Sequence, residues 1–352
     1  MKATATTMRS WRTHEYGAPL DVLHLDAVAI PEPDAGEVRV RVHAIPLNLN
    51  DLERINGGNM MVRPDLPYAP GMEVMGVVDA CGAGAETYAG KRVVATTKGA
   101  HGGYAEFAIC PTSGVFEIPD SIPLPDAAAL FFPFHLAWLG LVDRACIQAG
   151  ESVLIHAGAG GSGSAAIQLA KHMGATVFAT AGSDEKVALC RKLGADIAIN
   201  YTTENFSDVV LANTANLGVD VVFDNVGEAV FEGSVRATKY NGRYLMMGFA
   251  SNKVVADEAF IVPRRVIMSN IKLCGVVLGY ANDDMRSFLK TAMGWNMPPV
   301  ELGRDIMHNI TKLYTDGVIN AVIGKTATFE EIPEAIDAMA RRATTGRTIV
   351  VL

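Results

Sequence analysis

The chain has 352 residues, of which 49% are hydrophobic and 19% are charged, and its formal net charge is -8. This balance excludes an intrinsically disordered chain, and the length predicts about two folded domains. An acidic chain without a run of Lys and Arg gives no electrostatic reason to expect a nucleic-acid partner.

Up to about residue 130, short segments with strand character are separated by Pro and Gly. Glu37–Ala44 alternates valine with charged residues, and Met72–Ala80 is a second short segment of this kind. Alternation with a period of two residues is typical of half-buried strands. The region therefore predicts a mostly antiparallel, turn-rich β domain.

The most hydrophobic stretch of the chain is Ala127–Val142. It is short for a span of a lipid bilayer, and it contains Pro133 and His135. We therefore expect a buried helix here, and no membrane as a partner.

From about Gly150 the pattern changes to apolar strands that alternate with helical segments. The strands are predicted at Ser152–Ala157, Thr176–Ala181, Val219–Val226, Arg243–Phe249 and Ile271–Leu278. Such alternation predicts an α/β domain with a parallel sheet that is covered on both faces. The last part of the chain, from about 281 to 352, combines a helix or two with a final strand, Thr348–Leu352, which needs a sheet to join.

A glycine-rich turn follows the strand that ends at Ala157. It contains Gly158, Gly160, Gly161, Ser162 and Gly163, and a helical segment begins directly after it. Glycine lets the backbone approach a pyrophosphate, and a helix N-terminus supplies N–H groups and the positive end of a dipole. Since the strand–turn–helix context is the one this motif requires, we expect a dinucleotide site; the alternative is a tight turn without a ligand.

The end of the second strand indicates which dinucleotide binds. NAD sites usually place a carboxylate there, whereas this chain has Ala181-Gly182-Ser183. Ser183, Lys186 and Tyr201 could hold a 2′-phosphate, so the expected cofactor is NADPH. In the alternative reading Lys186 is a solvated helix residue. Asp184 and Glu185 would repel a phosphate if they faced it, although acids also favour a helix N-terminus.

Cysteine usage bears on the cellular compartment. The five cysteines are odd in number and far apart, with no C-x-x-C pair, so neither a disulfide framework nor a local zinc ribbon is indicated. With no apolar signal-peptide region in Met1–Tyr16, this usage predicts a reducing, cytoplasmic location.

Several blocks of the chain resemble a known family. They include P-E-P-D-A-G-E-V-R-V-R-V-H-A, P-G-M-E-V-M-G-V-V, the long block from Leu141 to Lys171, and L-G-A-D-I-A-I-N-Y. Together they resemble the zinc-free quinone oxidoreductases of the medium-chain dehydrogenase/reductase superfamily over essentially the whole chain. The resemblance implies a GroES-like, mostly-β catalytic domain built from 1–132 and 281–352, and a doubly wound Rossmann domain at 133–280 that binds NADPH.

The main division within this superfamily concerns zinc. The positions that match the catalytic zinc ligands hold Asn48, Met72 and the segment Phe131-Phe132-Pro133, with Glu73 beside Met72. An amide, a thioether and phenylalanine do not build a tetrahedral Zn²⁺ site. The lobe that carries structural zinc is also missing, because Ala95–Ala105 contains no Cys. The expectation is therefore a protein without a metal.

The resemblance also carries site residues onto this chain. It places the catalytic positions at Asn48 and Asp51; we expect Asn48 to donate to a developing oxyanion, with a structural amide as the alternative, and Asp51 to be mainly structural. It adds Arg342 to the phosphate site of Lys186 and Tyr201. The nicotinamide is expected against the backbone near Asn225, Gly248, Phe249 and Val277. The chain departs from the family pattern at Glu53, Ile55 and Asn59, which leaves the substrate open.

These expectations combine into a zinc-independent oxidoreductase. It would transfer a hydride from NADPH to a quinone or a similar conjugated carbonyl acceptor, because such acceptors need no metal to polarise their oxygen. Two alternatives are an NADPH-dependent reductase of 2-alkenals or enoyl thioesters, and a weakly catalytic NADPH-binding sensor or interaction protein. The family resemblance further implies a homodimer through Ile271–Leu278.

Overall fold

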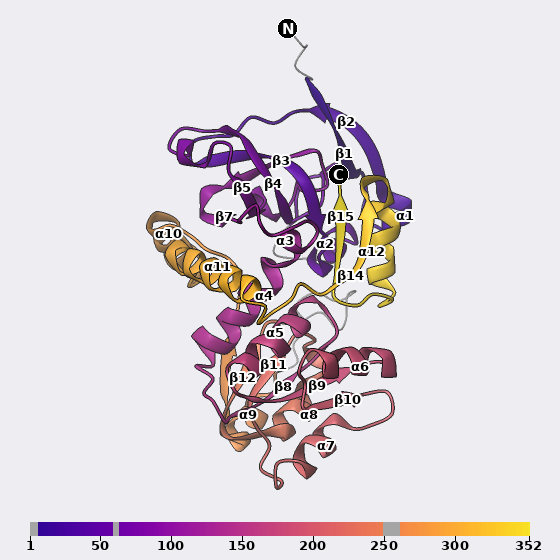
Figure 1. The fold of residues 1–352 in the computed structure, drawn as a ribbon, viewed down its shortest axis with the longest axis vertical. Helices are drawn as coiled ribbons and strands as arrows, with labels where there is room; N and C mark the ends of the chain where they lie inside the picture. The colour runs from indigo at the N-terminus through magenta and orange to yellow at the C-terminus, as the bar shows by residue number, and fades with distance from the viewer. Residues whose placement is uncertain (1–5, 59–62, 249–260) are drawn as a thin grey trace. The chain divides into compact units, whose positions relative to one another are not determined.

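The chain divides into two compact units in the computed structural model, which describes residues 6–58, 63–248 and 261–352 (Figure 1). Unit 1 contains Met1–Phe131, Gly279–Lys312 and Ile323–Leu352. Unit 2 contains Phe132–Leu278 and Leu313–Val322. The predicted domains placed all of 281–352 with the first domain, whereas packing groups Leu313–Val322 with unit 2.

Unit 1 is built around a seven-stranded sheet with the order β14-β15-β3-β4-β5-β7, in which β6 also pairs with β3. The pairs are antiparallel except for β14 with β15. The final strand joins this sheet as expected, since Ile349 of β15 lies opposite Pro46 of β3. The strands are β3 (Glu37–Pro46), β4 (Glu73–Cys81), β5 (Arg92–Thr96), β6 (Phe107–Pro111), β7 (Val115–Glu117), β14 (Ile323–Thr328) and β15 (Arg347–Val351).

The alternation in the sequence explains which face of this sheet is buried. Val38, Val40 and Val42 of β3 are at most 4% exposed and belong to the main core of the unit. A separate two-stranded sheet consists of β1 (Thr7–Thr13) and β2 (Leu23–Ala29). The helices of the unit are α1 (Pro19–Val22), α2 (Leu49–Ile55), α3 (Asp126–Ala129), α10 (Asp283–Met293), α11 (Val300–Thr315), whose end from Leu313 onward belongs to unit 2, and α12 (Ile332–Ala340).

Unit 2 contains a six-stranded parallel sheet with the order β10-β9-β8-β11-β12-β13. This is the doubly wound order in which the first strand lies centrally beside the fourth, and the point of reversal lies between β8 and β11. The strands are β8 (Ser152–Ile155), β9 (Thr176–Ala181), β10 (Ile197–Asn200), β11 (Val219–Asp224), β12 (Thr238–Met246) and β13 (Lys272–Gly275).

Apolar helix faces cover this sheet. Phe231 and Val235 of α8 and Val210 of α7 pack with the strands in one core, and Val266 of α9 packs against it. The helices of the unit are α4 (Phe132–Trp138), α5 (Gly161–His172), α6 (Asp184–Lys192), α7 (Phe206–Ala212), α8 (Glu228–Ala237) and α9 (Pro263–Ser269), with a π-helical segment, η4, at Leu139–Arg144. The α/β fold class is thereby confirmed.

The stretch expected as one buried helix is divided among α3, α4 and η4. The whole segment Asp126–Arg144 is long and apolar enough to cross a membrane, but 72% of its most hydrophobic window is buried inside the protein. A core helix satisfies the same criteria of length and composition, and burial of this extent is what a core helix shows.

Candidate functional site

The predicted site residues fall into two groups, one in each unit. Glycines and polar residues at the carboxyl ends of the parallel strands form the first group, in unit 2. Asn48, Asp51 and their neighbours form the second, in unit 1. Each group is described by itself.

The glycine turn lies between β8 and α5, where the sequence predicts it. A Cβ at Gly163 would lie 2.2 Å from the Ala157 oxygen and 2.8 Å from the Gly158 Cα, so only glycine allows α5 to pack this closely on the turn. Gly160 is the residue before α5, and a Cβ there would meet the Ala157 oxygen at 3.3 Å. Gly163 therefore serves close packing, whereas a Cβ at Gly160 would press on the Ala157 oxygen alone, beside the helix N-terminus, where an anion binds best.

Asn225 and Gly248 meet at the carboxyl ends of β11 and β12. A Cβ at Gly248 would lie 2.0 Å from the Asn225 carbonyl carbon, and the Gly248 N–H donates to the Asp224 oxygen at 2.9 Å. The Asn225 side chain donates to the His156 oxygen at 3.3 Å, beside the glycine turn. The strand ends on both sides of the reversal point are thus joined at one edge, which is where α/β sheets bind ligands.

Asp224 shapes this edge. Its Oδ1 accepts from the N–H groups of Val226 and Gly227 at 2.7 and 2.9 Å, and the Tyr244 hydroxyl donates to its Oδ2 at 2.5 Å. Burial raises the pKa of the Asp224 carboxyl to about 6, although these donors oppose the rise. The carboxyl therefore holds the turn that carries Asn225.

The tip of β9 gathers the residues predicted for a phosphate. A Cβ at Gly182 would lie 2.5 Å from the Tyr201 hydroxyl oxygen, so Tyr201 reaches the strand end. Ser183 caps α6 by accepting from the Lys186 N–H at 3.3 Å. The Asn200 amide donates to the Asp184 carboxylate at 2.8 Å, which gives this acid a partner within unit 2.

The remaining residues predicted for the cofactor are Val277, Arg342 and Phe249. Val277 follows the end of β13 and is 54% exposed. Arg342 lies in unit 1 after α12, with a φ of 56°. Phe249 lies outside the described residues, as does Asn59. The roles of these residues stay predictions.

Asn48 belongs to a buried polar network in unit 1. Its amide nitrogen donates to the Pro46 oxygen and to Glu73 Oε2, both at 3.1 Å, and its Oδ1 accepts from Arg347 at 2.8 Å. Arg347 also donates to Glu73 Oε2 at 2.5 Å. Both N–H groups of the amide are therefore engaged within the unit, which favours the structural alternative. An oxyanion donor at Asn48 stays a prediction, and it requires one of these bonds to exchange.

Asp51 caps the same region. It accepts from the backbone N–H groups of Asn48 and Met72 at 3.2 and 3.1 Å, from the Tyr104 hydroxyl at 3.3 Å and from Arg54 at 3.4 Å. The side chain is fully buried, and burial raises its pKa to about 6 against the influence of Arg54 and the other donors. With this bonding, Asp51 fixes the start of α2; the mainly structural role that we expected for it stays a prediction.

The residues at the zinc-ligand positions do not fit a metal. The Glu73 carboxylate is bonded to a guanidinium and an amide, and Met72 supplies a thioether. Across the described residues no group of three or more His, Cys, Asp and Glu has a geometry that could hold a metal ion. His135 is fully buried, and burial lowers its pKa to about 3, as expected of a core histidine.

Sequence reasoning missed Arg347 and the roles of Asp224 and Gly182. Arg347 is 299 positions from Asn48 in the sequence. One signal in the sequence could have indicated this role: Arg347 begins the terminal apolar strand, and a charge that is buried with such a strand needs a partner.

Comparisons with known proteins agree with this architecture. An alcohol dehydrogenase GroES-like domain model matches residues 34–120, and a zinc-binding dehydrogenase model matches residues 161–293. A quinone oxidoreductase of Sus scrofa is 29% identical over 98% of this chain and 98% of its own. A quinone oxidoreductase-like protein 2 of Rattus norvegicus is 32% identical over 90% of this chain and 85% of its own.

Solved structures lead to the same family. A mycobacterial protein in complex with NADPH has a TM-score of 0.82 and 25% identity, over 98% of this chain and 100% of its own. With both domain models matched and such relatives spanning most of the chain, the protein belongs to the medium-chain dehydrogenase/reductase superfamily, in its quinone oxidoreductase-like family, and is an oxidoreductase.

Proposed function

We propose that this oxidoreductase binds NADPH at the carboxyl edge of the unit 2 sheet and transfers a hydride to a quinone or a similar conjugated carbonyl compound. The observation that carries the proposal is the tip of β9, which has Ser183, Lys186 and Tyr201 and no acid in Ala181–Ser183. The solved relative in complex with NADPH and the relatives named quinone oxidoreductase support it.

The residues of this chain suit a dinucleotide in a way that their packing explains. The backbone at Gly160 and the N-terminus of α5 would hold the pyrophosphate. Ser183, Lys186 and Tyr201 would hold the 2′-phosphate, since a dianion favours a cation and hydroxyl donors. The edge that carries Asn225 and Gly248 would support the nicotinamide ring.

The chemistry of the acceptor follows from the donor set in unit 1. NADPH supplies a hydride when it is bound. Because Asn48, Met72 and Glu73 do not fit a metal, an acceptor that is already electron-poor suits this protein better than a simple ketone. Quinones, 2-alkenals and enoyl thioesters have this property, and the relatives' names favour the quinone.

The preference for NADPH over NADH is tested by titrating both dinucleotides into the unaltered protein and into two variants, Lys186→Ala and Lys192→Ala. Lys186→Ala should weaken NADPH by about 1–3 kcal/mol, the scale of a charge-assisted hydrogen bond, and leave NADH unchanged. Lys192→Ala, in the last turn of the same helix, is the matched control and should change neither. Equal losses of both dinucleotides in Lys186→Ala would refute the assignment.

Turnover with NADPH and each of a quinone, a 2-alkenal and an enoyl-CoA tests the acceptor. We expect the highest kcat/KM for the quinone. A clear preference for the alkenal or the thioester would replace the proposed substrate, and NADPH binding without turnover of any acceptor would favour a sensor.

A homodimer through the open edge of the unit 2 sheet is part of the same proposal. β13 is an end strand, and nearby apolar side chains are exposed: Ile267 by 70%, Met268 by 73% and Val277 by 54%. Light scattering should give about twice the mass of the 37.4 kDa chain, and Ile267→Glu should give the monomer.

The cytoplasmic location also stays a proposal; all five cysteines are free thiols, as a reducing compartment would keep them.

A further inference from the structure

The end of β9 carries an acid that a site for NADPH has to accommodate. Asp184 is the first residue of α6, directly after Ser183 and two residues before Lys186. An NAD site uses a carboxylate near this strand end to accept from the ribose hydroxyls, whereas a 2′-phosphate is a dianion that a nearby carboxylate repels. The direction in which the Asp184 carboxylate points therefore bears on which dinucleotide binds.

Asn200 holds this carboxylate. It is the last residue of β10 and pairs with Ala181, the last residue of β9. Its amide nitrogen donates to Asp184 Oδ1 at 2.8 Å. Asn200 is 8% exposed, so an exposed acid is bonded to a donor that is itself buried.

The turn after β10 fixes the orientation of the Asn200 amide. The amide oxygen accepts from the Thr202 N–H at 3.1 Å and from the Thr202 hydroxyl at 2.6 Å. Because a backbone N–H only donates, the amide oxygen faces Thr202 and the amide nitrogen faces Asp184. The Asn200 backbone oxygen closes the same turn by accepting from the N–H groups of Thr203 and Glu204 at 3.1 and 2.9 Å. The amide is therefore a fixed donor aimed at one carboxylate.

Tyr201, the next residue, reaches the end of β9 from the other face of the sheet. Its N–H donates to the Ala181 oxygen at 3.1 Å, which continues the ladder between the two strands. Its hydroxyl lies 2.5 Å from the position of a Cβ at Gly182. Since successive side chains along a strand point to opposite faces, Asn200 holds the acid on the face opposite to the Tyr201 hydroxyl.

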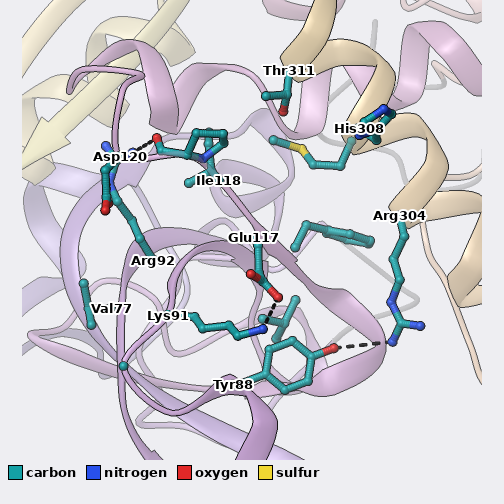
Figure 2. A pocket seen from close by; sticks show the side chains of 15 residues that line it. Val77, Tyr88, Lys91, Arg92, Glu117, Ile118, Asp120, Arg304, His308 and Thr311 are labelled. Carbon is teal, nitrogen blue, oxygen red and sulfur yellow. Dashed lines mark hydrogen bonds and ion pairs between the residues drawn. The ribbon is translucent and has the colours of Figure 1, made fainter.

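A neutral partner suits an acid at this place better than a cation would. At a surface hollow of unit 1, Figure 2 shows the other arrangement, in which the Lys91 ammonium donates to the Glu117 carboxylate. A cation paired in this way with Asp184 would be shared between the acid and the phosphate. The Asn200 amide restrains the acid without drawing on Lys186, the cation that we propose for the phosphate.

We propose that Asn200 is a positioning residue that sets the preference for NADPH over NADH, by holding the Asp184 carboxylate away from the adenosine ribose. The inference rests on the proposed dinucleotide site. Without the amide, the carboxylate would be free to rotate toward the ribose. There it would accept from the 2′-hydroxyl of NADH and repel the 2′-phosphate of NADPH.

The test compares the affinities of the full-length protein and its variants for NADPH and for NADH, by calorimetric titration. Asn200→Leu keeps the side-chain volume and removes the donor, and it should lower the preference for NADPH roughly three- to tenfold. Asn200→Ser is too short to reach Asp184 but keeps an acceptor for the Thr202 N–H, and the preference should fall in the same direction. Asn205→Leu, which removes the amide that caps α7, is the matched control and should leave the preference unchanged.

A double variant shows whether Asn200 acts through Asp184. In the Asp184→Asn background no carboxylate remains to be released, so Asn200→Leu should change the preference by less than about twofold. A full loss that persists in this background would place the effect in the turn that carries Tyr201, and it would overturn the proposal. An unchanged preference in both Asn200 variants, or equal losses of the two dinucleotides, would overturn it as well.

The titration of Lys186→Ala separates this inference from the proposed function. If Lys186→Ala weakens NADPH alone while the Asn200 variants keep the preference, the phosphate site stands and the role of Asn200 is refuted. If Lys186→Ala weakens both dinucleotides equally, the phosphate site is refuted, and this inference with it.

Discussion

The buried ion pair between Arg347 and Glu73 allows a quantitative test of what holds unit 1 together. The two side chains are 8% and 0% exposed, and Arg347 also bonds Asn48. Replacing Arg347 with Met keeps an aliphatic chain but leaves the Glu73 carboxylate buried without its guanidinium. Loss of one partner of a buried pair costs about 3–5 kcal/mol, because the remaining charge is then uncompensated. We expect Arg347→Met to lower the free energy of unfolding of unit 1 by that amount.

The double variant identifies the cause of the loss. Glu73→Gln removes the carboxylate charge that faces the replaced Arg347, and it keeps an oxygen that accepts from the Asn48 amide. Arg347→Met combined with Glu73→Gln should therefore cost less than the sum of the single variants, by about 1–3 kcal/mol.

Tryptophan emission during urea unfolding can report on unit 1 alone. The chain has three tryptophans, and Trp11 and Trp295 lie in unit 1, so the Trp138→Phe background removes the signal of unit 2. The control is Arg341→Met, whose pair with Asp337 at 2.9 Å is exposed and should contribute less than about 1 kcal/mol. The reasoning fails if Arg347→Met lowers the free energy of unfolding no more than Arg341→Met does. It also fails if the effects of Arg347→Met and Glu73→Gln simply add in the double variant.

Three further predictions concern the cofactor edge, the pH dependence of stability and metal content. Gly163→Ala should destabilise unit 2 in thermal unfolding because its Cβ meets the Ala157 oxygen, whereas Gly160→Ala should spare the Tm and still weaken NADPH in titrations. The pKa of Asp224 is raised from its usual 3.8 to about 6 in the folded protein, so between these pH values the folded state binds a proton that the unfolded state releases. The free energy of unfolding that this proton contributes, up to about 3 kcal/mol, is therefore lost as pH rises from about 4 to 6. Asp224→Asn should flatten the pH profile of urea unfolding in that window; an unchanged slope would contradict the raised pKa. Elemental analysis should find no stoichiometric zinc, and chelators should leave turnover intact; stoichiometric zinc would contradict the argument from the donor set.

Much of the fold and of the cofactor edge could be predicted from the sequence, because the information is local. Valine at every second position of β3 determines which face is buried, and apolar strands separated by helices determine a parallel sheet. The glycine turn needs only its own strand and helix to be recognised. Strand ends were less predictable: the strand expected at Ile271–Leu278 stops at Gly275, because its partner β12 ends at the paired residue Met246.

The sequence by itself therefore determined the fold class and the family, and it supplied the residues that we propose for NADPH. Only the tertiary structure decided that Arg347 bonds Asn48 and Glu73. The physical reason is that these features join side chains that are hundreds of positions apart. Hydrophobic periodicity and turn motifs act over a few residues, whereas the partner of a buried charge is chosen by how the whole sheet brings the two chain ends together.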